Sequence, residues 1–507
     1  MNRFVFKTGF TVLSICLFVL IMSCSTKESS SENILALVDD KTITVDEFVR
    51  RAEYTIRPPY CNKNNRLHKK IVLNSLIAEK LLSLEAGDDN AFISSPEVQM
   101  QMSGRKEQAM RLVQFYEDVY DKVEPDSSEI KKYIANIGRK YKIAYFNVDD
   151  PSLARQYQVF LENKSKTFEE VHSLVSPLAA IPNRTVSFET YENDVILDSL
   201  FSKKLNVEQI IGPVEIEKNQ YMFIKIIDWT HQPIMTDKAL QEKWKQVDDR
   251  LRLRDSSIAY KEFVANVMKG KQIEFEPKTF KKVVNLMGPV YFIPAEKKKE
   301  LTKNAIFKTG DEETNFTEFQ SELKKLYGAP LFKINNDIWT VEDFVRELNS
   351  HPLVFRDKSI KPQQFGKQMQ LAIGDLVRDK YLTEQAYKKG YDKKPYVTHT
   401  VNMWQDHTNY MYQKTQYLKS LNADSLLLRQ SVKVIDIYLN SYVDSLQTVY
   451  SDLIQIDLNK FDQIQLTNID MSVIQKNVPY SKPVPGFPLI TTDARFDYGQ
   501  LMEEKEK

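Results

Sequence analysis

The sequence predicts a mainly helical α+β protein in which two helical modules flank one smaller α/β domain. A repeat is the first reason, because the segment Val45–Arg50 recurs almost unchanged as Val341–Arg346. The second is a change of period near residue 141, where helical spacing of apolar residues gives way to short strand-like runs. A third observation is an apolar N-terminal leader that differs in composition from everything after it.

Residues 1–23 have the features of a secretion signal in the usual order. Arg3 and Lys7 give a positive start, and the apolar core Phe10–Met22 is shorter than the roughly 20 residues that a membrane-spanning helix needs. The ending Leu20–Cys24 resembles the bacterial lipobox, which predicts that Cys24 is lipidated after cleavage. An ordinary signal peptide with a chance cysteine is the alternative.

The polar residues 24–33 predict a flexible tether between the lipid and the folded part. Several acyl chains hold a protein on a bilayer far better than one chain does. Ser25 after the cysteine resembles lipoproteins sorted to the outer membrane, so we expect a lipid-anchored envelope protein, on the periplasmic face of that membrane.

Charge and cysteine content exclude several classes of protein. The chain has 70 basic and 69 acidic residues and a net charge of +1, so no nucleic-acid partner is expected. Cys16 leaves with the signal and Cys24 takes the lipid, which leaves Cys61 without a disulfide partner. Stability must therefore come from packed cores, which the 42% hydrophobic content can supply.

The first helical module is expected over residues 34–140. A strand at Ile34–Val38 and a turn lead to Thr44, which predicts a helix N-cap with Glu47 completing a capping box. Three further helices are expected: one over 67–86, one after Pro96 and one capped at Asp126–Glu129.

The α/β domain is expected over residues 141–230. It reads as a first strand, two helices, a short strand, a third helix and a closing hairpin, expected at 141–148, 152–163, 167–175, 186–188, 195–201 and 210–228. A long helical stretch over 231–276 is expected to complete the helical module, and 277–330 is a connecting region.

The second helical module, over residues 331–455, is predicted from the repeat. Thr44 matches Thr340, Val38–Asp40 matches Ile334–Asn336, and Leu76–Leu81 matches Leu376–Tyr381. Phe48 and Phe344 should therefore occupy equivalent buried positions, and the two modules should contact each other. The rest of the chain, 456–507, is expected to be extended and to lie against a neighbouring domain or fray, because it contains the proline-rich stretch Ser481–Pro488.

At this point the chain resembles the SurA/PrsA-type family of exported chaperones, whose helical domain surrounds parvulin-type (PpiC) peptidyl-prolyl isomerase domains. The resemblance lies in residues 34–51, 72–86, 125–148, 205–228 and 244–275, in this order, and again in the helical part over 331–420. It implies two SurA-N-like helical modules and one parvulin-like domain.

The departures from the family pattern concern catalysis. Parvulin domains carry a histidine in the first strand and another in the last, where this chain has Tyr145 and Met222. Neither side chain supplies an imidazole, so no catalytic residue is assigned and the domain is interpreted as degenerate. Adaptable apolar groups remain as candidate peptide contacts, with ordinary sheet packing as the alternative; they are Tyr145, Phe146, Phe188, Tyr191 and Met222.

No other chemistry is indicated. The six histidines are scattered, no metal-binding or nucleotide-binding motif is present, and Cys61 has no evident base partner, so neither a cofactor nor a metal is expected. We therefore expect a holdase chaperone for unfolded exported chains, outer-membrane proteins among them. A weakly active prolyl isomerase that uses the Tyr145 hydroxyl is one alternative, and a fixed subunit of an envelope assembly is another.

Overall fold

The computed structural model describes residues 33–190, 192–294, 313–357, 359–423 and 431–502. The predicted fold class is confirmed at its coarse level, because the chain is α+β, 55% helical, with small sheets. It forms two compact units, which we call the helical unit (described residues 33–114 and 267–502) and the sheet unit (115–266). The predicted signal sequence (1–23), Cys24 and almost all of the predicted tether (24–33) lie outside the described residues.

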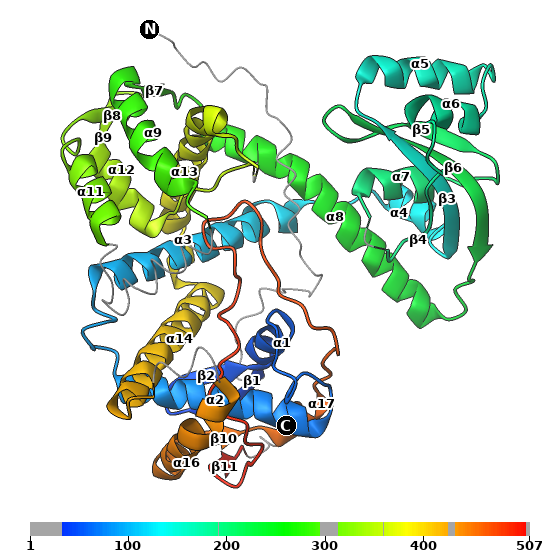
Figure 1. Ribbon diagram of the computed structural model, residues 1–507. Coiled ribbons are helices and arrows are strands. Elements are labelled where there is room, and N and C mark those ends of the chain that lie inside the picture. The colour runs from blue at the N-terminus through cyan, green and yellow to red at the C-terminus, as the bar shows by residue number, and fades with distance from the viewer. Residues whose placement is uncertain (1–32, 191, 295–312, 358, 424–430, 503–507) are drawn as a thin grey trace. The chain divides into compact units, whose positions relative to one another are not determined.

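The sheet unit is built on four antiparallel strands in the order β4-β3-β6-β5 (Figure 1). Strand alternation gives this sheet two buried faces with separate cores. One core contains Phe168 and Val171 of α6, and the other contains Ile130 of α4 and Leu197 of α7. The elements are α4 (Ser127–Ile134), β3 (Arg139–Val148), α5 (Pro151–Glu162), α6 (Phe168–Val175), β4 (Asn183–Ser187), α7 (Asp194–Phe201), β5 (Ile210–Glu217), β6 (Gln220–His231) and α8 (Asp237–Val267).

The sheet unit is wider than the 141–230 range predicted for it. Tyr133 of α4 is 1% exposed and belongs to the sheet core, as do Val247 and Leu251 of α8. The prediction that both helices belong to the helical module is therefore wrong. Their apolar sides pack on the sheet instead. The helical period could not predict this, because it shows which side of a helix is apolar but not which element that side packs against.

The helical unit contains the two predicted copies of one module. Copy 1 and copy 2 have the same order of two strands and three helices (Figure 1). Copy 1 comprises β1 (Ile34–Val38), β2 (Lys41–Thr44), α1 (Val45–Glu53), α2 (Arg66–Ala86) and α3 (Pro96–Asp118). Copy 2 comprises β8 (Pro330–Ile334), β9 (Asp337–Thr340), α12 (Val341–Ser350), α13 (Phe365–Lys388) and α14 (Pro395–Ser420).

Local geometry confirms the repeat in detail. Asp39 and Asn335, at matching places in the two strand–strand turns, both have a positive φ of 55°. Asp and Asn tolerate this left-handed conformation better than other residues with a side chain. Phe48 and Phe344 are both 0% exposed, as predicted from their matching positions.

The capping boxes of the two copies differ. Thr340 and Asp343 complete one, with each side chain accepting from the other residue's main-chain N–H. In copy 1, Thr44 accepts from the N–H of Glu47 at 3.0 Å, but the Glu47 carboxylate faces Lys80 and His399. The prediction for Glu47 was therefore half wrong, because buried cations outcompete the N-cap N–H for this carboxylate.

The third helices of the two copies are exchanged. α14 packs along α2 of copy 1, and α3 sends Met110 and Val113 into a cluster with Ala386 of α13. On α3, Arg111 also donates to Thr383 on α13 at 2.7 Å. The modules contact each other, as predicted, and the core of copy 1 includes Tyr410 and Leu418 of the exchanged helix α14. The core of copy 2 contains no described residue of α3, which instead packs on α13 outside that core.

Two small sheets and the remaining helices complete the helical unit. In one sheet the order is β11-β10-β1-β2, and in the other it is β7-β8-β9. The elements not yet given are β7 (Ile273–Phe275), α9 (Pro277–Tyr291), α11 (Glu313–Lys324), α15 (Ser431–Val434), α16 (Asn440–Val449), β10 (Ile454–Ile456), α17 (Leu458–Gln463) and β11 (Gln500–Leu501).

Candidate peptide-binding surface

The candidate peptide contacts of the sheet unit do not share one exposed face. Met222 and Phe188 are each 4% exposed in one core, with Tyr145 packed beside them. Phe146 is also 4% exposed but lies in the core on the other face, where it stacks on Phe223. Tyr191 lies outside the described residues. Tyr145 and Phe146 are neighbours on β3, so the ordinary alternation of side chains along a strand places them on opposite faces of the sheet.

Tyr145 takes part in a packed polar contact. The guanidinium of Arg184 lies 4.3 Å from the centre of its ring, and Arg184 also pairs with Glu192 at 2.5 Å. This cation–π contact explains a half-buried tyrosine at an edge of the core without any catalytic role.

The described residues offer little other chemistry. No three His, Cys, Asp or Glu groups among them come together as a metal site. Cys61 is 0% exposed, and burial raises the pKa of its thiol to about 12, so little reactive thiolate forms near neutral pH.

The extended segment 464–499, which we call the strap, is the most distinctive feature of the helical unit. It contains no regular helix or strand, yet several of its side chains are buried. Phe487 and Ile490 join the core of copy 1, and Val484 packs with Met102 of α3 and Trp404 of α14. Residues 464–499 lack regular secondary structure and lie against the folded body, as predicted. The predicted extended range 456–507 was too wide, because Asp457 caps the helix α17 and residues 500–501 form the strand β11.

Polar side chains of the helical unit hold the strap by its main chain. In copy 1, Lys69 donates to the carbonyl of Ile464 at 2.7 Å, and Arg57 to that of Thr467 at 2.9 Å. On α3, Gln108 donates to the carbonyl of Tyr480 and accepts from the N–H of the same residue.

The same pattern continues along the second part of the strap. Arg51 donates to the carbonyl of Gly486 at 2.9 Å, and Asn74 to that of Asp493 at 2.8 Å. Lys414 on α14 lies 3.5 Å from the carbonyl of Leu489. Because main-chain carbonyls occur in every polypeptide, these bonds do not depend on the side chains of the strap. Other contacts do depend on them, since Asn440 also bonds the hydroxyls of Thr491 and Thr492.

A buried charge cluster supports the part of the strap near Gly486. Arg51 forms two hydrogen bonds with Glu79, at 2.6 and 2.8 Å, and His407 contacts the same carboxylate at 2.8 Å. Burial alone would raise the pKa of Glu79, but Arg51 and His407 hold it well below its usual range. Burial lowers the pKa of His407, which favours its neutral form near neutral pH. The negative charge of Glu79 is then balanced by the positive charge of Arg51.

Lys414 is held differently from Arg51. It is 3% exposed, and the hydrogen bonds described for its ammonium are to neutral oxygens, those of Tyr410 and Leu489. Burial therefore lowers the pKa of Lys414 to about 8. A largely charged lysine at neutral pH thus lies under the strap, and no described carboxylate forms an ion pair with it.

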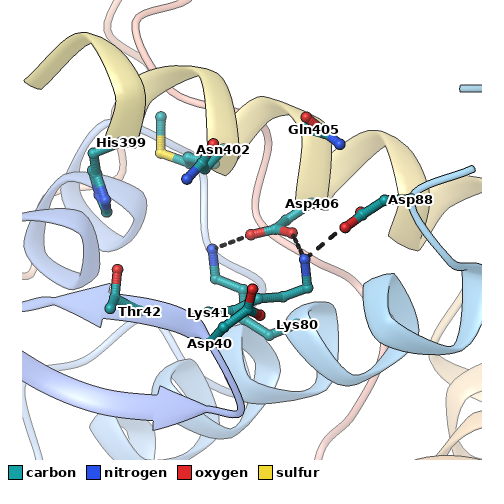
Figure 2. A pocket seen from close by; sticks show the side chains of 10 residues that line it. Asp40, Lys41, Thr42, Lys80, Asp88, His399, Asn402, Gln405 and Asp406 are labelled. Atoms are coloured by element: carbon teal, nitrogen blue, oxygen red, sulfur yellow. Dashed lines mark hydrogen bonds and ion pairs between the residues drawn. The ribbon is translucent and has the colours of Figure 1, made fainter. Parts of the chain in front are cut away.

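A pocket of about 190 Å³ lies where the β1–β2 turn meets α2 and α14. Figure 2 shows Lys41 and Lys80 converging on the carboxylate of Asp406, with 2.8 Å to each ammonium. Lys80 also faces Glu47 at 3.3 Å. Lys41 also lies 3.9 Å from Asp88, so three carboxylates face the two ammonium groups. The pocket walls are best explained as an electrostatic contact between α2 and the exchanged helix α14.

No protein-family model matches the sequence, and no curated protein matches it either. Among the described residues, no helix is both long enough and apolar enough to cross a membrane. The functional assignment therefore depends on the geometry of the strap and on the resemblance described above.

Proposed function

We propose that this protein is an exported folding factor that holds unfolded polypeptides without acting on them chemically. The observation that carries the proposal is the recognition of the strap, a long extended chain, through its main-chain carbonyls. A holdase must accept many sequences, and main-chain recognition provides that tolerance.

The sheet unit fits a degenerate parvulin-type domain within this proposal. Its order of elements, strand–helix–helix–strand–helix–strand–strand, agrees with the resemblance. At the two histidine positions stand Tyr145, engaged by Arg184, and Met222, which is 4% exposed. Both are committed to packing, which favours loss of catalysis over a weakly active isomerase. Two SurA-N-like modules beside such a domain complete the proposed arrangement.

The holdase proposal is tested by aggregation of an unfolded outer-membrane protein diluted from urea. Light scattering should fall in the presence of stoichiometric amounts of the soluble protein that begins at Ser25. Unchanged scattering, or one stoichiometric partner in pull-downs from envelope extracts, would favour the fixed-subunit alternative. A protease-coupled assay on a prolyl peptide should show no turnover above the uncatalysed rate, and turnover lost in Tyr145→Phe would establish the isomerase instead.

The proposed location is the periplasmic face of the outer membrane, through lipid on Cys24. Metabolic labelling with a fatty acid should tag the natural protein and not Cys24→Ala. Label on the Cys24→Ala protein would contradict this anchor.

A further inference from the structure

The hydrogen bonds between the strap and the helical unit run in both directions near the ends of the strap, where Asn64 and Asn440 accept from the N–H groups of Leu466 and Thr492. Over residues 484–490, by contrast, the bonds described run from donors of the helical unit to carbonyls of the strap. Over the proline-rich part, Arg51 and Lys414 donate toward the carbonyls of Gly486 and Leu489. Pro485 lies directly before the first of these acceptors and Pro488 directly before the second, and both prolines are buried. Since proline has a carbonyl but no N–H, a proline-containing segment can be buried against such a surface without leaving a donor unsatisfied.

The surface under the strap is also unusually polar for a permanent core. Arg51, Asn74 and Lys414 are each 3% exposed or less, and each donates into the strap. Charged groups lose solvation when they are covered, so a fixed interface is usually at least as stable with apolar residues there. A surface that is alternately covered and open to water needs such groups, because they are hydrated when it is open.

Apolar anchors make the contact specific for extended chains with spaced large residues. Phe487 and Ile490 enter the core of copy 1, and Val484 enters the cluster with Met102 and Trp404. These three side chains are separated along the strap by the prolines and by the carbonyls that the helical unit binds.

We infer that residues 480–493 of the strap are a displaceable internal ligand, and that clients with extended, proline-containing, apolar segments bind in their place. This inference rests on the proposed holdase function and adds its substrate class and its regulation. The strap then sets the affinity for clients, since a client must compete with a segment already present at high effective concentration.

The test uses the soluble protein that begins at Ser25 and, as probe, fluorescently labelled, reduced and carboxymethylated α-lactalbumin, which stays unfolded. Hydrogen exchange of the amides in 480–493 should become faster when the probe is bound. In Phe487→Ala the strap is weakened, so the probe should bind about tenfold more tightly, because a larger fraction of molecules is open.

Phe280→Ala is the matched control. Phe280 and Phe487 are both 8% exposed phenylalanines of the helical unit, but Phe280 belongs to a core that contains no strap residue. Its variant should be destabilised without a gain in affinity, and circular dichroism shows whether both variants are folded. Binding with unchanged exchange in 480–493, or with equal affinities for the two variants, would overturn the inference and leave the holdase function standing. No binding by any variant, Phe487→Ala included, would contradict the holdase function itself.

Discussion

The two copies of the helical module use the same carboxylate position in different ways. Glu79 of copy 1 and Asp379 of copy 2 match in the repeat, and both are buried. Glu79 is bound by Arg51 from its own copy and by His407 from the exchanged helix α14. Asp379 is bound by His351 from its own copy and faces Arg111, 3.8 Å away on the exchanged helix α3.

The difference lies in what covers each cluster. In copy 1, Arg51 is fully buried and also binds the strap, whereas in copy 2 the side chain of Arg378 beside Asp379 is 16% exposed and also pairs with Asp375. In copy 1 the matched carboxylate therefore lies in a closed charge cluster under the strap. In copy 2 it lies in a more exposed network of ion pairs. The cation also differs, because the position that matches Arg51 is Glu347 in copy 2 and Arg378 takes its place beside Asp379.

The largest effect is expected from removing the two buried carboxylates. Glu79→Gln should lower the free energy of unfolding by about 3–5 kcal/mol, because it leaves Arg51 buried without its main counter-charge. Asp379→Asn should cost about 1–3 kcal/mol, since Arg378 keeps Asp375 and Arg111 keeps Thr383. Urea unfolding of both variants measures the two costs. Equal costs would show that the strap does not set the difference.

The effect of acid on stability should differ between Glu47 and Asp343, which occupy matching positions in the two copies. The surrounding cations, Lys80 foremost, lower the pKa of the buried Glu47 to about 2 although burial opposes the shift. A lowered carboxyl pKa contributes stability above the unfolded value, and this contribution is lost as pH falls toward the folded value. Glu47→Gln should therefore cost about 2–3 kcal/mol at pH 7, and the deficit should shrink between pH 4.5 and pH 2.

Asp343→Asn, the matched change in copy 2, should cost about 0.5–1 kcal/mol, because that carboxylate is part of a solvent-accessible capping box. Thermal unfolding of both variants over this pH range gives the comparison. A Glu47→Gln deficit that is independent of pH would contradict the buried-charge explanation.

Lys414→Met should stabilise the protein, by about 1–2 kcal/mol at pH 7, because it removes an ammonium buried without a carboxylate contact. The folded pKa of Lys414 is lowered to about 8, so the unfolded chain binds more protons between about pH 8 and 10.5. Natural stability should thus rise with pH in this window, and the advantage of Lys414→Met should disappear. Calorimetry at pH 7 and pH 10 tests this, and a destabilised Lys414→Met protein at pH 7 would show that the lysine is needed in place.

The smallest effect is expected at the two N-caps. Thr340→Ala should cost about 1 kcal/mol, because it removes the threonine half of a reciprocal capping box. Thr44→Ala should cost about 0.5 kcal/mol, as only one hydrogen bond from the N–H of Glu47 is lost. Thr44→Ser and Thr340→Ser, which keep the hydroxyl, are the controls and should retain most of the stability.

Local signals in the sequence predicted most elements, and the repeat predicted equivalent positions for Phe48 and Phe344. The exchange of α3 and α14 could not be predicted, because each apolar helix face fits more than one partner. The strap was predicted only as an extended segment. Its partners Arg51 and Lys414 are distant in sequence from Gly486 and Leu489, and nothing in their local pattern marks them as donors to a main chain.

The exchanged helices also constrain the order in which the protein can be made. α2 is completed by α14, and β1 pairs with β10, so copy 1 cannot close until segments near the C-terminus are available. Contacts so distant along the chain are slow to form. During the export proposed above, the sheet unit could fold from contiguous residues before the partners of copy 1 are available. The protein proposed to bind unfolded chains therefore remains partly unfolded itself until its C-terminal segments are available.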